Sequence, residues 1–391
     1  FSYSITDGTY TIPASASLDI TPVNDAPVLS ATTNPAAVVE AVNAAAQNLA
    51  PISGSFSVTD ADVGNTLTAS VVGSPTVLLN GVSYTLPAGA SALTALGSFA
   101  LTSPGASTGG SQSVGYTYDP AAANLDFLLA DQTLTITYAV KVNDGTNDSI
   151  TRNVTFTITG TNDGPVAVDD AASVAEDATV TGTAVTGVLF NDTDPDTGDT
   201  KTVIDVAAGL FSPPGSVGNP LPGIYGTLTL HADGSYTYVA NLPDAQKLAE
   251  GQTVSEDFIY TMEDSAGETS TAELTFTITG TNDVPVLSAI TPPSTVAEAA
   301  NAAAQDIAPV AGTLAVNDAD VGDTLSAALS GTPTLVWSGG TLSPAQISAL
   351  TAALVTGKLS FGSAVVSDGA TKNIGYTWDP SAANLDFLGA G

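Results

Sequence analysis

Apolar and polar residues alternate over short stretches along most of this 391-residue chain. The stretches 133–142 (TLTITYAVKV), 153–159 (NVTFTIT), 227–230, 235–239 and 273–279 place an apolar side chain at every second position. A period of two is typical of strands with one buried face. Asp-Gly or Asn-Gly pairs, which favour tight hairpin turns, stand at 80–81, 144–145, 233–234 and 368–369. Short strands at this spacing predict an all-β chain of Ig-like antiparallel β-sandwiches.

Two stretches predict helical turns between the strands. Ser343 followed by Pro344 is typical of a helix start, so we expect a turn or two over 343–354. The stretch 242–250 is a second candidate.

A short motif, Asn-Asp-x-Pro, occurs three times, at Asn24-Asp25, Asn162-Asp163 and Asn282-Asp283. The segments after the first and third copies share VTDADVGNTL / VNDADVGDTL and VGYTYDPAAANLDFL / IGYTWDPSAANLDFL, whereas the segment after the second differs. Such self-similarity predicts tandem domains. We expect residues 1–25 to be the C-terminal strands of a preceding sandwich, 26–163 an A-type sandwich, 164–283 a B-type sandwich, and 284–391 an A-type sandwich truncated at its C-terminal end. The domains would form an elongated array, and the chain reads as a window cut from something longer.

The charge is almost entirely acidic. The chain has 6 Lys and Arg against 39 Asp and Glu, a net charge of −33, although only 12% of its residues are charged. Such a surface repels nucleic acid and anionic lipid and attracts cations. With no cysteine, disulfides and thiolate metal sites are excluded. No run reaches the roughly 18 apolar residues of a membrane span.

The carboxylates are clustered in relation to the Asn-Asp motif. An Asp-x-Asp follows each copy, at Asp60/Asp62, Asp194/Asp196 and Asp318/Asp320, by 35, 31 and 35 residues (60 − 25, 194 − 163, 318 − 283). Hairpin aspartates, Asp144 and Asp264, precede the last strand of the first two sandwiches, and Asp7 is in a similar position near the start. In an up-and-down seven-strand sandwich these loops open at one end. The linker, the Asp-x-Asp and the hairpin Asp should therefore converge there.

Converging carboxylates need a cation to offset their repulsion. Hard oxygen ligands without His or Cys suit Ca²⁺, which takes six to eight oxygens. The alternative is turn chemistry, because Asp and Asn also favour tight turns. Recurrence at a consistent offset favours calcium.

Asn-Asp-x-Pro between sandwiches, followed by Asp-x-Asp, resembles the cadherin-type interdomain calcium site. The stretch GTLTLHADGSYTYVAN (226–241) with DFIYTMEDSAGETSTAELTFTITGTND (257–283) is similar to the VCBS-type repeats of giant bacterial surface adhesins. Those proteins are RTX-type adhesins, secreted by the type I route. The resemblance covers nearly the whole chain, and it is more specific for the B-type segment than for the A-type segments.

The cadherin pattern also implies a Glu from the first strand and an acid from the loop before strand six of the domain that precedes each linker. Glu40, Glu176 and Glu298 occupy the first position, and Asp126 and Asp386 lie near the second. The paired acid motif of that loop is absent here beyond Leu-Asp. The B-type segment offers only Asp244 and Glu250 as candidates.

The resemblance implies calcium-stiffened extender repeats of a large adhesin at the bacterial cell surface, which support attachment or biofilm. The partners would be neighbouring domains of the same chain, with no nucleic acid and no membrane insertion. The alternative is a structural subunit of an extracellular filament, sheath or surface layer, assembled by strand complementation between chains.

Catalysis finds little support in the sequence. His231 is the one histidine and stands beside an Asp-Gly turn, so we interpret it as a solvated strand end. A glycosidase carboxylate pair would need an acid in an apolar cleft, whereas these acids stand in polar loops. Aromatic residues could form a sugar platform, but their strand positions favour sandwich packing; they are Trp337, Trp378, Tyr116, Tyr118 and Tyr376. We expect no enzymatic activity.

Overall fold

The structure is a computed structural model, and it describes residues 1–43, 49–120, 123–209, 212–293, 295–297, 308–337, 340–380 and 385. The chain divides into two compact units. The first consists of Phe1–Gly164 together with two loops, Asp194–Thr200 and Asp264–Glu268. The second consists of Pro165–Thr193, Lys201–Glu263 and Thr269–Gly391. Each unit is described by itself below.

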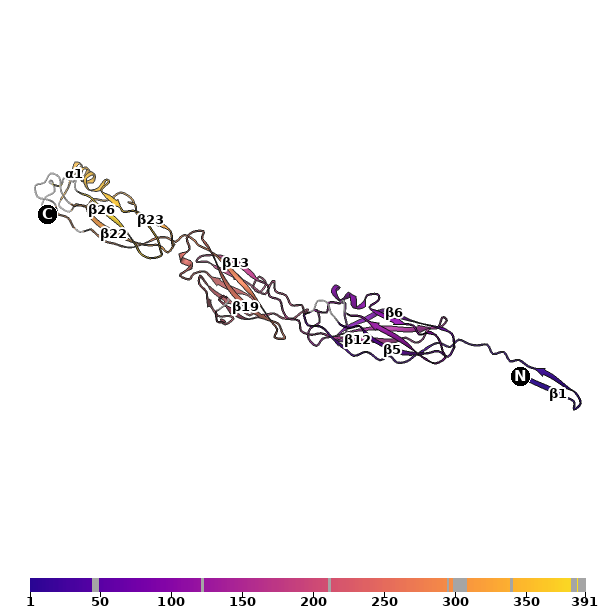
Figure 1. Ribbon diagram of the computed structural model, residues 1–391. Coiled ribbons are helices and arrows are strands. Elements are labelled where there is room, and N and C mark those ends of the chain that lie inside the picture. The colour runs from indigo at the N-terminus through magenta and orange to yellow at the C-terminus, as the bar shows by residue number, and fades with distance from the viewer. Residues whose placement is uncertain are drawn as a thin grey trace. The chain divides into compact units, whose positions relative to one another are not determined.

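The first unit contains two sheets over one core, and a separate hairpin that pairs β1 (Ser2–Thr6) with β2 (Thr11–Ser15) (Figure 1). One sheet has the order β3-β5-β10-β8, which are Val28–Leu29, Ile52–Thr59, Ser111–Tyr118 and Phe99–Thr102. The other has the order β4-β12-β11-β6-β7, which are Val38–Val39, Arg152–Thr159, Thr133–Asn143, Thr66–Leu79 and Val82–Ser83. The short β9 (Gly105–Ala106) pairs with β6, and a 3₁₀ helix, η1, covers Ala88–Thr94.

The core of this sandwich forms where the alternating strands turn their apolar faces to one another. Strand β11 alternates half-buried and buried positions along its whole length, as its period of two predicts. Tyr118 from β10 stacks on Phe156 from β12 with ring centroids 4.2 Å apart, which joins the two sheets. Both side chains are fully buried, so this aromatic pair lies at the centre of the core.

The second unit repeats this plan over residues 170–279. One sheet has the order β13-β20-β19-β15, which are Asp170–Ala175, Thr269–Thr279, Thr253–Glu263 and Thr202–Ala207. The facing sheet has the order β14-β18-β17-β16, which are Thr179–Gly182, Tyr236–Val239, Thr227–Leu230 and Leu221–Pro222. Tyr238 and Phe276 stack across the two sheets with centroids 4.0 Å apart, in the same manner as Tyr118 and Phe156.

The second unit also contains the described part of a third sandwich. Strands β21 (Val286–Ile290), β22 (Val310–Asn317), β26 (Lys372–Trp378) and β24 (Leu359–Phe361) form one sheet, and β23 (Thr324–Leu325) pairs with β25 (Val365–Val366). Helix α1 (Pro344–Leu350) starts at Ser343 with a capping box to Gln346, as predicted, and a π-helical turn, η3 (Thr351–Val355), follows it. The predicted turn at 242–250 is the short 3₁₀ helix η2 (Ala245–Lys247).

The all-β prediction is confirmed, with two differences in strand pairing. The edge strand β4 pairs with β12 in parallel, and β13 pairs with β20 in parallel over six positions. Strand β5 pairs with β10 and not with β6, so the strand order is not the up-and-down order assumed from the sequence. Periodicity defines which face of a strand is buried but leaves its neighbour undetermined, which is why the sequence did not reveal these pairings.

Three of the predicted Asp-Gly or Asn-Gly turns connect hydrogen-bonded strands. Asn80-Gly81 joins β6 to β7, and both residues have positive φ, 50° and 81°, as a type I′ hairpin turn requires.

The domain boundaries at residues 26, 164 and 284 stay predictions. Within the described residues, no helix combines the length and apolar character needed to cross a membrane.

Candidate metal centre

The linker residues Asn162 and Asp163 hydrogen-bond to two loops that are distant in sequence. The Asn162 side-chain amide donates to Asp264 Oδ2 over 2.8 Å, and the Asp163 backbone N–H donates to Asp196 Oδ2 over 2.9 Å. The Asp196 N–H in turn donates to Asp194 Oδ1 over 2.9 Å, which fixes the Asp-x-Asp turn. The structure therefore brings together the linker pair, the Asp-x-Asp and the hairpin Asp, as the sequence predicted for this linker.

The first linker has the same contacts. Asn24 donates to Asp144 Oδ2 over 2.9 Å, the Asp25 N–H donates to Asp62 Oδ2 over 2.7 Å, and the Asp62 N–H donates to Asp60 Oδ1 over 3.0 Å. One arrangement of a linker and two loops thus occurs twice in the first unit.

The third linker, in the second unit, repeats the main part of the pattern. The Asp283 N–H donates to Asp320 Oδ2 over 2.7 Å, and the Asp320 N–H donates to Asp318 Oδ1 over 3.2 Å. The Asn282 side chain donates to the Asp283 carbonyl over 2.9 Å. The linker aspartate therefore has the same backbone contact at all three positions.

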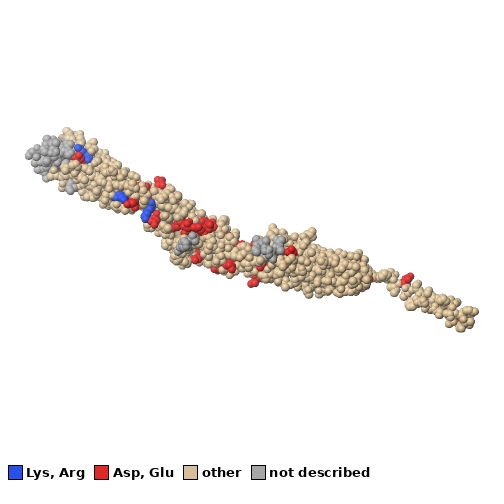
Figure 2. All heavy atoms as spheres, in the orientation of Figure 1, with Lys and Arg blue, Asp and Glu red and all other residues tan. Residues whose placement is uncertain are grey.

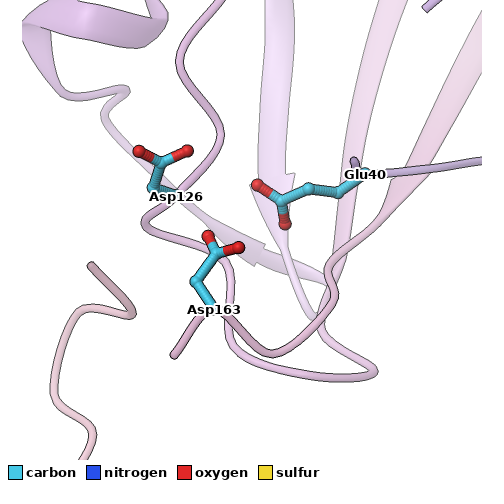
Figure 3. Close-up of side chains that lie close together, drawn as sticks. All are labelled: Glu40, Asp126 and Asp163. Carbon is cyan, nitrogen blue, oxygen red and sulfur yellow. The ribbon is translucent and has the colours of Figure 1, made fainter. Parts of the chain in front are cut away.

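Glu40, Asp126 and Asp163 form a carboxylate triad, with one oxygen from each lying within 4.8 Å of the others (Figure 3). Figure 3 shows the three carboxylates converging from separate segments of the chain. The Thr161 N–H donates to Glu40 Oε2 over 3.2 Å and so orients the glutamate. Glu176 is held in the same way by Thr281, also over 3.2 Å. Glu298 and Asp386 lie outside the described residues.

A second group contains Asp194, Asp199 and Asp264, whose oxygens also lie within 4.8 Å of one another. Asp199 was not predicted. Its Oδ1 accepts from the Ser265 N–H over 3.2 Å, beside the hairpin Asp. The sequence did hold a signal, because Asn65, Asp199 and Asp323 each follow the first acid of their Asp-x-Asp by five residues.

Asn43 is a further residue that the sequence analysis missed. Its backbone N–H donates to Asp163 Oδ1, and its side-chain oxygen accepts from the Gly164 N–H over 2.9 Å. Its φ is 54°, a conformation that Asn tolerates better than most residues.

Many of these acids are buried and have an oxygen with no hydrogen-bond donor. Asp163 and Asp320 are fully buried, and Glu40 is 4% exposed. Oxygens without a donor belong to Glu40, Asp60, Asp126, Asp163, Glu176, Asp196, Asp199, Asp283 and Asp320. A buried carboxylate oxygen without a partner is costly, so the arrangement is suited to a bound cation.

Burial, with a smaller contribution from neighbouring carboxylates, raises the pKa values of the central acids. Burial raises the pKa of the Glu40 carboxyl to about 8, and the nearby charge of Asp163 adds to the rise. Burial likewise raises the pKa of Asp196 to about 6. Burial also acts to raise the pKa of Asp264, but hydrogen bonds from Asn162 and the 266–268 backbone outweigh it and lower that pKa. The two kinds of acid are thus distinct: Asp264 has donors on both carboxylate oxygens, whereas Glu40, Asp163 and Asp196 each keep one oxygen without a donor.

The donor set suits a hard cation such as calcium. It is made of carboxylate and amide oxygens, with no sulfur and no imidazole at these positions. On the face shown in Figure 2, acidic groups gather in patches and basic groups are few. Glu40, Asp126 and Asp163 could hold one ion, and Asp194, Asp199 and Asp264 could hold another.

Other candidates do not contribute to these groups. His231 is exposed at the end of β17, as predicted. Tyr116, Tyr118 and Tyr376 are buried in sandwich cores, which argues against a sugar platform; Trp378 is half-buried and donates to the Leu354 carbonyl over 2.7 Å, and Trp337 is half-buried. Asp244 is exposed and pairs with Lys247, Glu250 is exposed, and Asp7 accepts from the N–H groups of its own turn.

Comparison with known proteins finds a family model that matches one part of the chain and solved structures that resemble more of it. No curated protein matches it. It is similar to a solved structure of protocadherin gamma B7 extracellular cadherin domains 1–4, at 12% identity over 92% of this chain and 69% of that chain, with a TM-score of 0.40. It is also similar to mouse cadherin-23 EC22-24, at 16% identity over 70% of this chain and 71% of that chain, with a TM-score of 0.33. Residues 162–280, which include the whole second sandwich, match the family model of the bacterial cadherin-like domain.

Proposed function

We propose that this chain is a series of calcium-stiffened spacer repeats from a large extracellular bacterial adhesin of the VCBS-containing, type I secreted kind. The observation that carries the proposal is the set of buried carboxylate oxygens without donors beside the Asn-Asp linkers. The cadherin-like match over 162–280 supports it, because such modules are typically structural or adhesive and not enzymatic. The support of attachment or biofilm and the position at the cell surface belong to the same proposal.

The mechanism is electrostatic. Without a cation, the acids of a linker and its two loops repel one another, and the linker bends. A Ca²⁺ ion bound by oxygens from several of these segments offsets the repulsion and fixes their mutual position. Extracellular sites with dissociation constants of about 10⁻⁴ to 10⁻³ M are substantially filled at millimolar calcium. Binding to the folded form alone then stabilises each site by roughly 1 kcal/mol at several-fold excess.

The implied partners are neighbouring domains of one long chain arranged as an elongated array. A net charge of −33 argues against nucleic acid and anionic membranes as partners.

Small-angle X-ray scattering of the whole chain tests the proposal. Calcium should increase the maximum dimension and the melting temperature relative to a chelator-treated sample. Magnesium at equal concentration should do so poorly, because it demands tight octahedral geometry and gives up water reluctantly. An unchanged maximum dimension would rule out stiffening, and equal effects of both ions would argue for general charge screening.

A filament or surface-layer subunit is the second candidate, and one observation favours it. Strands β1 and β2 pair only with each other among the described strands, and the apolar side chains of this hairpin, Tyr3, Ile5, Tyr10 and Ile12, are at least half exposed. Such a hairpin could complete a sheet of another copy. Sedimentation velocity should then show association that Ile5→Ser abolishes and that Val185→Ser, an exposed control, preserves. A monomer at all concentrations would exclude this candidate.

A further inference from the structure

We infer that the linker at Asn162-Asp163 binds calcium more tightly than the linker at Asn282-Asp283, because the second sandwich has Gln246 where the first has Asp126. The inference rests on the proposed function and adds to it a difference in affinity between two sites.

The equivalence of Asp126 and Gln246 comes from backbone hydrogen bonds. The Gly160 N–H donates to the Gln132 carbonyl over 2.8 Å, and the Gly280 N–H donates to the Gln252 carbonyl over the same distance. The offset is 120 for both partners (280 − 160, 252 − 132), so the same loop packs against the same strand end in both sandwiches.

The offset holds through the loop itself. The Leu128 N–H donates to the Leu125 carbonyl over 2.9 Å, and the Leu248 N–H donates to the Ala245 carbonyl over 2.9 Å. Leu125 and Ala245 are both fully buried. The residue after each of them is Asp126 in one sandwich and Gln246 in the other (246 − 126 = 120).

The other two members of the carboxylate triad are retained. Glu40 and Glu176 each accept from a threonine N–H over 3.2 Å, from Thr161 and Thr281 respectively. The linker aspartates, Asp163 and Asp283, follow those threonines by two residues. The second linker therefore has two carboxylates of the triad and an amide in the third place.

Gln246 is engaged in a different contact. Its Nε2 donates to Asp177 Oδ1 over 2.8 Å, and Asp177 is exposed beside Glu176. The next residue, Lys247, brings a positive charge to the loop, where it pairs with Asp244 over 2.6 Å. Lys247 is thus neutralised by Asp244, and because the affinity of an oxygen site for calcium depends on its ligand charge, the carboxylate missing at Gln246 weakens the second linker.

The burial of the first triad makes the loss of a carboxylate matter. Asp163 is fully buried and Glu40 is 4% exposed, and each has an oxygen without a donor, as does Asp126. One oxygen from each of these three acids lies within 4.8 Å of the others, so an ion bound among them is suited to satisfy the oxygens that lack donors.

Hydrogen–deuterium exchange of the whole chain at stepped calcium concentrations tests the inference, because it reads each linker separately. Peptides covering 159–166 and 279–286 should become protected with midpoints at least about tenfold apart, the first at lower calcium, since even outer-shell changes cost 10–100-fold in metal affinity. Equal midpoints in the unmodified chain would overturn the inference. If calcium protects neither linker, the proposed function fails and the inference fails with it.

Two exchange variants sharpen the test. Asp126→Gln should move the midpoint of the first linker toward that of the second and leave the second unchanged. Gln246→Asp should lower the midpoint of the second linker. Asp131→Asn is the matched control, because it removes a carboxylate from the same loop at an exposed position with φ of 63°, which Asn tolerates.

The control variant should keep both midpoints. Protection of peptides within β11 and β19 shows that each variant is folded. If Asp126→Gln leaves the first midpoint in place while β11 stays protected, Asp126 does not contribute to the affinity and the inference is wrong.

Discussion

The backbone N–H of Asp163 donates to Oδ2 of Asp196 over 2.9 Å, and each of these two carboxylates keeps one oxygen without a donor. The linker is therefore bound to a loop 33 residues later through its backbone, which leaves its side chain available for an ion. The same bond joins Asp25 to Asp62. The recurrence of Asn-Asp-x-Pro thus corresponds to a repeated hydrogen bond from the linker Asp N–H to the second Asp of the Asp-x-Asp. The proline fixes its own φ and favours an extended backbone at the residue before it.

Asp163→Asn should weaken calcium binding at its linker by about tenfold or more while both adjacent sandwiches stay folded. The backbone bond to Asp196 survives because the side chain does not make it, but the charge is lost. Isothermal titration of the whole chain measures the number of ions and their affinity, with Asp131→Asn as the control. If the variant binds as many ions as tightly, Asp163 is only a turn residue.

The double variant Asp194→Ala and Asp196→Ala should loosen the linker at 162–163 and leave the one at 282–283 protected in calcium. The second linker is held by Asp320 and Asp318 instead, and independent sites behave additively. Hydrogen exchange of peptides over the two linkers measures this. Equal loosening of both linkers would show that the assignment of loops to linkers is wrong.

The metal-free protein should be more stable at pH 5 than at pH 8. The pKa of Glu40 is raised from 4.5 to about 8 and that of Asp196 from 3.8 to about 6, so the folded state keeps protons that the unfolded state releases. The contribution of these two carboxyls to the free energy of unfolding is therefore greatest below their ordinary pKa values, 4.5 and 3.8, and it is lost as the pH rises toward 8. Thermal unfolding in calcium-free buffer from pH 5 to pH 8 measures the trend. A melting temperature that rises with pH would contradict it.

Phe276→Ala should destabilise the second sandwich by about 3–5 kcal/mol, because it removes a fully buried ring that stacks on Tyr238. The control is Phe190→Ala, since Phe190 is 72% exposed and its loss should cost under about 0.5 kcal/mol. Exchange of β19 peptides in increasing denaturant reports on this sandwich alone. Similar effects of both variants would argue against the stacked core.

Much of the fold could be predicted because the strands alternate so regularly. The predicted strand at 133–142 is β11 (Thr133–Asn143), and the predicted strand at 153–159 is β12 (Arg152–Thr159). Tight turns were equally readable, since Asn-Gly and Asp-Gly tolerate positive φ. The parallel edge pairings could not be predicted, because the local pattern of β4 and β13 does not specify their partners.

The candidate site could be predicted in outline and not in detail. The spacing of Asp-x-Asp from each linker pointed to convergence, and the structure brings these residues together through Asp196, Asp62 and Asp320. Asp199 was missed because it stands in a turn where Asp is common. The sequence did not predict that Gln246 takes the place of Asp126, because the second loop has no acid at that position. Only the backbone hydrogen bonds align the two residues.

The parallel pairing of β13 with β20 has a mechanical consequence. Tension that pulls Asp170 toward the N-terminus and Thr279 toward the C-terminus slides the two strands past each other along their length, so their hydrogen bonds are loaded together and cannot be peeled one by one. Six register positions share that shear in the second sandwich, whereas β4 and β12 share it over two in the first. Under such tension the first sandwich would yield at the lower force, and the second would resist longer.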